Sequence, residues 1–162
     1  MSFRTKALGV GAAGILGVVA IAGPFVAGWE GLRTDAYLDP VGIPTICYGH
    51  TRGVEIGHRA TREHCEQLLA GELIEYAEAV HERVMVPMPD TRFAALTSFA
   101  YNVGIGNFER STMLRLLNDG RTREACNELT RWVFAKGRIL RGLQRRRHAE
   151  KELCLQGLPE ET

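Results

Sequence analysis

The chain has 162 residues, which is the length of one domain or of one domain with a short appendage. Its residues are 45% hydrophobic and 24% charged, which is ordinary globular usage and excludes a wholly disordered chain. The 20 basic and 19 acidic residues leave a formal net charge of +1. The chain therefore lacks the basic excess of a protein held to nucleic acid by bulk charge, and we expect no nucleic-acid partner.

An uncharged run at residues 7–28 follows Arg4 and Lys6. As a helix it is long enough to cross the core of a bilayer. The basic residues before it predict that the amino terminus stays in the cytoplasm while the rest of the chain is exported. The run is nevertheless a weak anchor, because it holds six Gly, six Ala and Pro24, which add little transfer free energy or weaken a helix.

Four interpretations of this run stay open. It could be a signal peptide cleaved near Ala20-Ile21-Ala22, a permanent anchor, an anchor that can leave the membrane, or a buried helix of a soluble protein. Composition favours the three export routes over the buried helix, and it does not choose among those three.

The four cysteines of the chain agree with export. An even number of cysteines in a small exported domain predicts disulfides, and four cysteines allow three pairings. No two cysteines have C-x-x-C spacing and the five histidines are scattered, so we expect no metal site. Phosphate-binding and dinucleotide-binding loop motifs are absent as well, so we expect no cofactor. The cysteines are Cys47, Cys65, Cys126 and Cys154.

Turn residues and β-formers at residues 36–52 predict a small sheet of short strands. Thr61 is a suitable N-cap for a long helix that runs to about Val84. The inner face of this helix is predicted from apolar residues at helical spacing, namely Cys65, Leu68, Leu69, Ile74, Ala77, Val80 and Val84.

The remainder of the chain is predicted to be helical. Asp90 is expected to cap a second helix, which Gly104 and Gly106 end. Three shorter helices follow at about 112–117, 122–134 and 143–155, the first capped by Ser111. The residues expected in the core are Phe93, Leu96, Phe99, Ala100, Val103, Trp132 and Phe134. The fold class is therefore α+β, with a small sheet lobe, a larger helical lobe, a long helix joining them and a cleft for an extended substrate between them.

Two carboxylates and a hydroxyl are regularly spaced just after the uncharged run. Eight residues separate Glu30 from Asp39, and five separate Asp39 from Thr45. Glycoside hydrolysis needs a protonated and an ionised carboxyl group on opposite sides of the scissile bond. Burial near Trp29 would keep Glu30 protonated, a more solvated Asp39 would stay charged, and Thr45 could hold the attacking water. The spacing alone also allows two surface carboxylates and a strand threonine.

This stretch resembles the signature of phage-type lysozymes, glycoside hydrolase family 24, in which the Glu, Asp and Thr at these spacings are closely followed by Gly-His, here Gly49-His50. The weak amino-terminal segment and the cysteine positions resemble, more narrowly, the signal-anchor-release endolysins of phages that infect Gram-negative bacteria. The resemblance covers nearly all of residues 29–157. Its further matches are SFAYNVGIGNF at 98–108, Ser111-Thr112, Arg131-Trp132 and the G-L-x-x-R-R run that begins at Gly142.

The resemblance implies a lysozyme-like fold and hydrolysis of the β-1,4 bond between N-acetylmuramic acid and N-acetylglucosamine in peptidoglycan, for host cell lysis. Glu30 would be the general acid, Asp39 the base or electrostatic stabiliser, and Thr45 would help to place water. The resemblance also implies inversion at the anomeric carbon, and it supports the two sequence-local disulfides, Cys47 with Cys65 and Cys126 with Cys154.

Four further polar residues are candidates for lesser roles. His50 and Asn102 are candidates for substrate binding, although His50 is better suited to orienting the sheet loop near Thr45. Arg145 and Arg146 are candidate ion-pair partners of Glu30 or another acid, or part of a solvated face.

The resemblance implies a division into a signal-anchor-release segment at 1–28 and a catalytic domain at 29–162. Residues 7–28 would hold the exported chain in the host inner membrane, amino terminus inside, before its release into the periplasm as a monomer. Only Trp29 separates the run from Glu30, so we expect the inserted form to be inactive. The alternatives are a secreted lysozyme with a cleaved signal peptide, a lytic transglycosylase, and a non-catalytic, membrane-tethered wall-binding protein.

Overall fold

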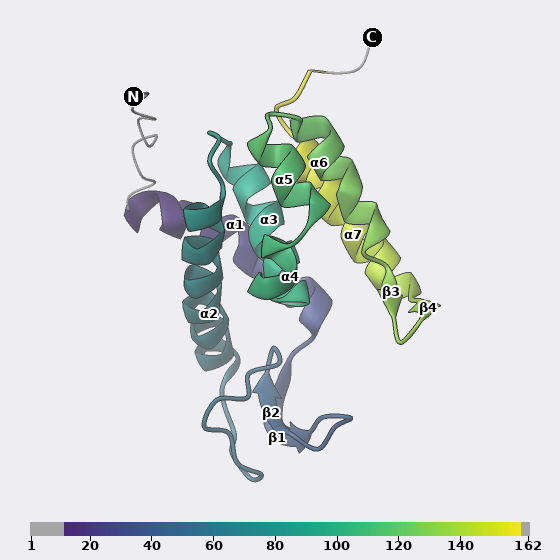
Figure 1. Cartoon of the computed structure of the whole chain (residues 1–162). Helices are drawn as coiled ribbons and strands as arrows, with labels where there is room; N and C mark the ends of the chain where they lie inside the picture. The colour runs from purple at the N-terminus through teal and green to yellow at the C-terminus, as the bar shows by residue number, and fades with distance from the viewer. Residues whose placement is uncertain (1–11, 160–162) are drawn as a thin grey trace.

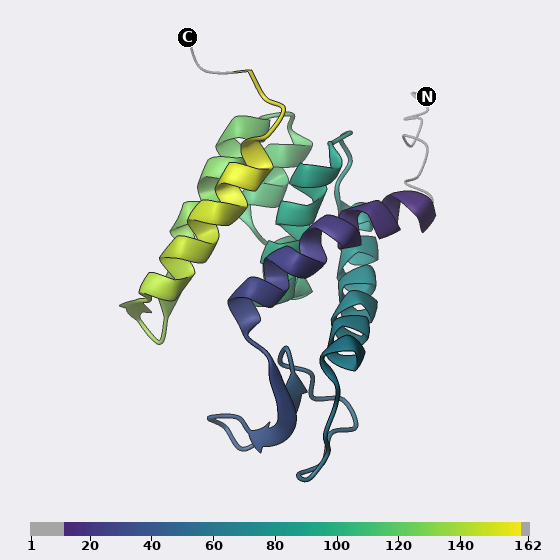
Figure 2. The same ribbon diagram turned by 180° about the vertical axis from the view of Figure 1, so that it is seen from behind.

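The uncharged amino-terminal run forms α1 (Ala12–Glu30) in the computed structural model, which describes residues 12–159. Residues 7–11 of the run lie outside this range. The helix crosses α2 and α3 (Figure 2) and buries one face against them, at Ile15, Val18, Val19, Ala22 and Val26. The opposite face is open to solvent, as at Leu16. Within residues 12–159, no helix has both the length and the hydropathy needed to cross a membrane.

The predicted sheet is present as an antiparallel pair, β1 (Arg33–Leu38) and β2 (Pro44–Cys47). Tyr37 pairs with Thr45 and Leu38 with Pro44. The sheet begins three residues before the predicted region, so the chain leads from the end of α1 almost directly into β1 at the junction of the two lobes (Figure 1).

The long connecting helix is α2 (Arg62–Arg83), and its predicted cap is confirmed. The Thr61 hydroxyl accepts a hydrogen bond from the backbone N–H of His64 at 3.1 Å, which satisfies one of the free donors of the first turn. The inner face matches the prediction at the buried residues Cys65, Leu69, Ala77 and Val80, and it also includes Leu73. The helix reaches from the β lobe into the helical lobe (Figure 1).

The centre of the helical lobe is α3 (Asp90–Val103), in which residues 92–100 are all buried. It packs against α1, α2 and α7, so these three helices are held together through α3. The remaining elements are α4 (Ile105–Glu109), α5 (Thr112–Asn118), α6 (Thr122–Glu128), a 3-10 turn (Leu129–Arg131), β3 (Phe134–Ala135), β4 (Arg138–Ile139) and α7 (Arg141–Leu155). The α+β architecture expected from the sequence is confirmed.

Two predicted helix ends near α3 were wrong. Asp90 is the first residue of the helix and not its cap, because Pro89 occupies the cap position without a side-chain hydrogen bond. Gly104, with φ of 86°, does end α3, since the left-handed region is easily reached only by glycine. Gly106 instead lies within α4, a short helix that the sequence did not suggest.

The predicted helix at 122–134 was also wrong in its second half. Regular helix stops at Glu128, and the chain then forms a 3-10 turn and the β3–β4 hairpin. The hairpin turn consists of Lys136 and Gly137, both with positive φ, and such turns suit the twist of paired strands. Phe134 lies on this hairpin and is 61% exposed, so its predicted place in the core was wrong.

The structure contains the two sequence-local disulfides. Cys47–Cys65 joins β2 to the first turn of α2, and Cys126–Cys154 joins α6 to the end of α7. Each lobe therefore has one disulfide bond, and Cys47–Cys65 fixes the sheet against α2.

Replacing both Cys47 and Cys65 by Ser should lower the free energy of unfolding by about 3 kcal/mol, because the closed loop no longer restricts the unfolded chain. Urea unfolding of the oxidised proteins measures this loss. The matched double variant at Cys126 and Cys154 should show a similar decrease in the free energy of unfolding. The wild type under reducing conditions should show the sum of the two decreases. An unchanged urea midpoint in the first variant would contradict the prediction.

Candidate active site

Glu30 is the last residue of α1 and stands where the two lobes meet. Its side chain is 24% exposed, so solvent or a ligand can reach it. Nη1 of Arg146, from α7, donates a hydrogen bond to Glu30 Oε1 at 2.6 Å. This ion pair confirms one of the two expected arginine partners and holds the carboxyl group in one orientation. Within residues 12–159, Glu30 Oε2 has no hydrogen-bond partner.

Asp39 lies in the turn between β1 and β2 and organises it. Its Oδ1 accepts hydrogen bonds from the backbone N–H of Val41 at 2.9 Å and of Ile43 at 2.8 Å. An aspartate that binds its own backbone in this way stiffens a turn. Both bonds use Oδ1, so within the described part of the chain Oδ2 is left for a bound molecule.

Thr45 follows on β2 and is 3% exposed. Its hydroxyl donates to the carbonyl oxygen of Ile43 at 2.9 Å, and the same carbonyl accepts the backbone N–H of Asp39 at 3.0 Å. The peptide groups of Ile43 therefore fix Asp39 and Thr45 relative to each other. This arrangement belongs entirely to the hairpin and needs nothing from the helical lobe.

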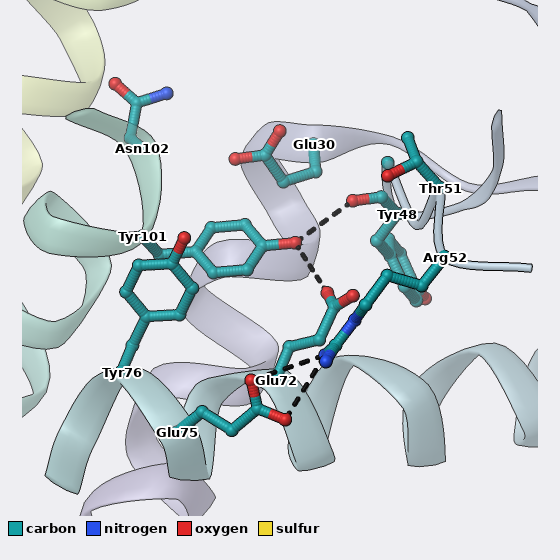
Figure 3. Close-up of a pocket in the computed structure, with 10 residues that line it drawn as sticks. Glu30, Tyr48, Thr51, Arg52, Glu72, Glu75, Tyr76, Tyr101 and Asn102 are labelled. Carbon is teal, nitrogen blue, oxygen red and sulfur yellow. Dashed lines mark hydrogen bonds and ion pairs between the residues drawn. The ribbon is translucent and has the colours of Figure 1, made fainter. Parts of the chain in front are cut away.

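A cavity of about 390 Å³ opens beside Glu30 (Figure 3). Asn102, expected to bind substrate, lines it, whereas Asp39 and Thr45 do not. The cavity thus lies between the two lobes beside Glu30, and Asp39 and Thr45 lie outside its lining. The lining residues are Glu30, Tyr48, Gly49, Thr51, Arg52, Glu72, Glu75, Tyr76, Tyr101 and Asn102.

His50 contacts Glu72, a residue that lines the cavity, and joins the β lobe to α2. Its Nδ1 is 2.6 Å from Oε1 of Glu72, and its Nε2 is 3.0 Å from the carbonyl oxygen of Arg52. Both ring nitrogens are therefore occupied within the protein. These contacts suit orientation of the sheet loop better than direct contact with a substrate.

Glu72 and Tyr101 are the site residues that sequence reasoning missed. The Tyr101 hydroxyl lies 3.1 Å from Glu72 Oε2 and 3.3 Å from the carbonyl oxygen of Tyr48, between Glu30 and Glu72 (Figure 3). Burial, and then the charge of Glu72, raise the pKa of Tyr101 above its ordinary value. The hydroxyl thus stays protonated and serves as a donor. A signal was available, since Glu72 interrupts the apolar face of α2 next to the buried Leu73.

The remaining lining groups make the cavity polar. Arg52 and Glu75 form an exposed ion pair at 3.2 Å, and the rings of Tyr76 and Tyr101 meet edge to face with 5.2 Å between their centroids. Carboxylates, hydroxyls and an amide around two aromatic rings suit a ligand rich in hydroxyl and amide groups, such as an amino sugar. Among residues 12–159, no group of three or more His, Cys, Asp or Glu could hold a metal ion.

Comparison with known proteins gives consistent similarities. The family model described as phage lysozyme matches residues 27–150. The SAR-endolysin of bacteriophage PS119 is 41% identical over 148 residues, which cover 87% of this chain and 89% of the relative.

Two solved structures share the fold over nearly the whole chain. The muramidase domain of SpmX from Asticaccaulis excentricus has a TM-score of 0.78 and 35% identity, covering 93% of this chain and 99% of that one. The active form of the P1 phage endolysin Lyz has a TM-score of 0.77 and 28% identity, covering 93% and 96% of the two chains.

Replacing Tyr101 by Phe should lower the free energy of unfolding by about 1–2 kcal/mol, because Glu72 and the Tyr48 carbonyl lose a buried donor. Thermal and urea unfolding measure the change. Tyr76→Phe is the matched control, since its ring lines the same cavity and its hydroxyl makes no hydrogen bond within residues 12–159. Equal losses in the two variants would contradict the assigned role of the Tyr101 hydroxyl.

Proposed function

The chain belongs to the phage lysozyme family, and from this premise we propose that it is an endolysin that lyses its host by hydrolysing the β-1,4 bond between N-acetylmuramic acid and N-acetylglucosamine in peptidoglycan. The observation that carries the proposal is the position of Glu30. The Glu30 carboxyl group is paired with a buried arginine and lines a polar cavity between the two lobes.

In the proposed reaction Glu30 is the general acid. Arg146 holds Oε1, so Oε2 is the oxygen that carries the proton to the glycosidic oxygen of a sugar chain lying in the cleft. Asn102 and Tyr101 then contact the sugar from the helical side of the cavity.

Asp39 is proposed to act on the other side of the scissile bond, as the base or as an electrostatic stabiliser. Its free Oδ2 can accept a proton from the attacking water, and the Thr45 oxygen retains lone pairs that can accept a hydrogen bond from that water. A water placed between carboxylate and sugar leads to inversion at the anomeric carbon, for which carboxyl groups about 6.5–9.5 Å apart are typical.

Glu30→Gln should reduce the hydrolysis of purified peptidoglycan by more than about a hundredfold, because the amide keeps the shape of the side chain but has no proton to give to the leaving oxygen. The release of soluble fragments measures the rate, and proton NMR of fresh product reports its anomeric configuration. Asp35→Asn is the control, since Asp35 is 68% exposed on β1 and pairs with Arg59 at the surface. Normal hydrolysis by Glu30→Gln would refute the assignment.

We also propose that residues 7–28 tether the exported chain to the host inner membrane, amino terminus inside, until it is released into the periplasm as a monomer. The name of the PS119 relative, SAR-endolysin, and the weak apolar character of the run support this route. Residues 1–28 and 29–162 are then the anchor and the catalytic domain. While α1 is in the bilayer it cannot cover α2 and α3, and Glu30 cannot reach Arg146, so the tethered form is inactive.

Replacing Gly11, Gly14 and Gly17 together by Leu should trap the protein in the membrane fraction and suppress lysis, because leucine raises the free energy of leaving the bilayer. Cell fractionation and culture turbidity measure the two effects. Gly23→Ala is the control, since a Cβ there meets no atom within 4 Å of it in the folded protein and changes hydropathy little.

Full lysis by a membrane-retained triple variant would overturn the proposed control by the anchor. The mass of the periplasmic wild-type protein separates this route from a cleaved signal peptide, because only the proposed route leaves residues 7–28 in place.

A further inference from the structure

A chain of charged side chains runs from the interior of the helical lobe to Glu30. Glu150, on α7, is fully buried. Its Oε1 accepts hydrogen bonds from Arg146 Nε at 3.1 Å and from the Ser98 hydroxyl at 2.7 Å, and its Oε2 accepts from Arg147 Nη1 at 2.5 Å. Arg146 continues the chain, because its Nη1 donates to Glu30.

The charge of this cluster depends on the proton of Glu30. With Glu30 ionised, the two carboxylates and two guanidinium groups sum to zero, and with Glu30 protonated, as in the proposed acid, they sum to +1. Glu150 is then the one carboxylate that offsets the two guanidinium groups. Arg147 is fixed from several further directions, by the carbonyl oxygen of Trp132 at 3.1 Å, by the side chain of Asn102 and by the face of the Phe99 ring. Among residues 12–159, every buried side-chain nitrogen and oxygen has a hydrogen-bond partner.

Arg146 is therefore shared between two acids. Glu150 takes its Nε and Glu30 takes one of its terminal nitrogens, while Nη2 contacts the carbonyl oxygen of Ser98 at 3.3 Å. The guanidinium group cannot turn without breaking its contacts to α3 and Glu150. The positive charge of Arg146 also acts more weakly on Glu30, because the Glu150 carboxylate lies against the same guanidinium group.

We propose that Glu150 is a positioning residue for the reaction, which holds Arg146 against Glu30 and offsets the positive charge that Arg146 and Arg147 bring to this acid. The inference rests on the proposed role of Glu30 as the general acid. It adds a residue that never touches substrate and acts only through Arg146.

The other charged and titratable groups facing Glu30 are compensated within the cavity. Tyr101 from α3 is a neutral donor, Glu72 from α2 is bound by His50 and Tyr101, and Glu75 is paired with Arg52. The remaining titratable groups that line the cavity are Tyr76, whose ring contacts Tyr101, and Tyr48, whose carbonyl oxygen accepts from the Tyr101 hydroxyl. None of these partnerships involves Glu150, so a substitution there leaves them in place.

The test is the pH–rate profile of peptidoglycan hydrolysis by the full chain. In Glu150→Gln the side chain keeps its shape but loses its charge, so the positive charge of Arg146 acts on Glu30 without compensation. The alkaline limb of the profile should move down by about one to two pH units, the effect of one charge about 6–12 Å away at an effective dielectric constant of about 20. The rate above the limb should fall by at least about tenfold.

Arg147→Gln tests the same coupling with the opposite sign. Without Arg147 one positive charge fewer acts on Glu30, so the alkaline limb should move up. Glu152→Gln is the matched control, because it removes the same charge from the same helix at a site that is 66% exposed, where solvent screens it. Its limb should stay at the wild-type position.

Opposite shifts in the two cluster variants, with none in Glu152→Gln, support the inference. If the two cluster variants had lower thermal stability or a lower rate but an unmoved alkaline limb, the inference would be overturned, because the cluster would then serve packing alone. If Glu150→Gln does not fold, Arg147→Gln decides by itself. Titration of the Glu30 carboxyl by 13C NMR measures the same coupling without catalysis. If peptidoglycan hydrolysis did not depend on Glu30, the assignment of Glu30 as the general acid would be refuted, and this measurement would still test the coupling.

Discussion

The ion pair between Glu30 and Arg146 is the interaction on which the site depends, and it joins residues 116 positions apart in the sequence. Glu30 ends α1 and Arg146 lies on α7, and each of these helices packs separately on α3. The two side chains meet only when both helices are in place. The orientation of the acid therefore depends on the packing of both helices on α3.

The two carboxyl groups of the site are held in different ways. Asp39 and Thr45 are arranged by the backbone of a single hairpin, through Ile43, so the hairpin can form this half locally. Glu30 and its cavity depend on α1, α2, α3 and α7 together. Cys47–Cys65 and the contact of His50 with Glu72 then bring the halves together, because each joins the β lobe to α2. The width of the cleft is thus set by groups that carry out no chemistry.

The sequence predicted what local chemistry determines. The Thr61 cap, the stop at Gly104 and the spacing of Glu30, Asp39 and Thr45 are readable because each depends on a few neighbouring residues. The β3–β4 hairpin was missed because strands of two residues have no periodicity, and Leu129 and Val133 continue a helical spacing after the helix has ended. Glu72 was missed because its partner Tyr101 lies on another helix. Glu150 was missed because its contact with Ser98 exists only once α3 and α7 are packed together.

The open outer face of α1 has a consequence for the timing of lysis. Under the proposed route the helix must suit two surroundings, first lipid and then the surface of α2 and α3. Val18 and Val26 are completely buried in the second, so the folded enzyme restricts their size. Leu16 and the other exposed residues of α1 face water there, and they face lipid before release. Selection can therefore lengthen or shorten the delay before the cell bursts by changing one side of a single helix, while the side that builds the enzyme stays as it is.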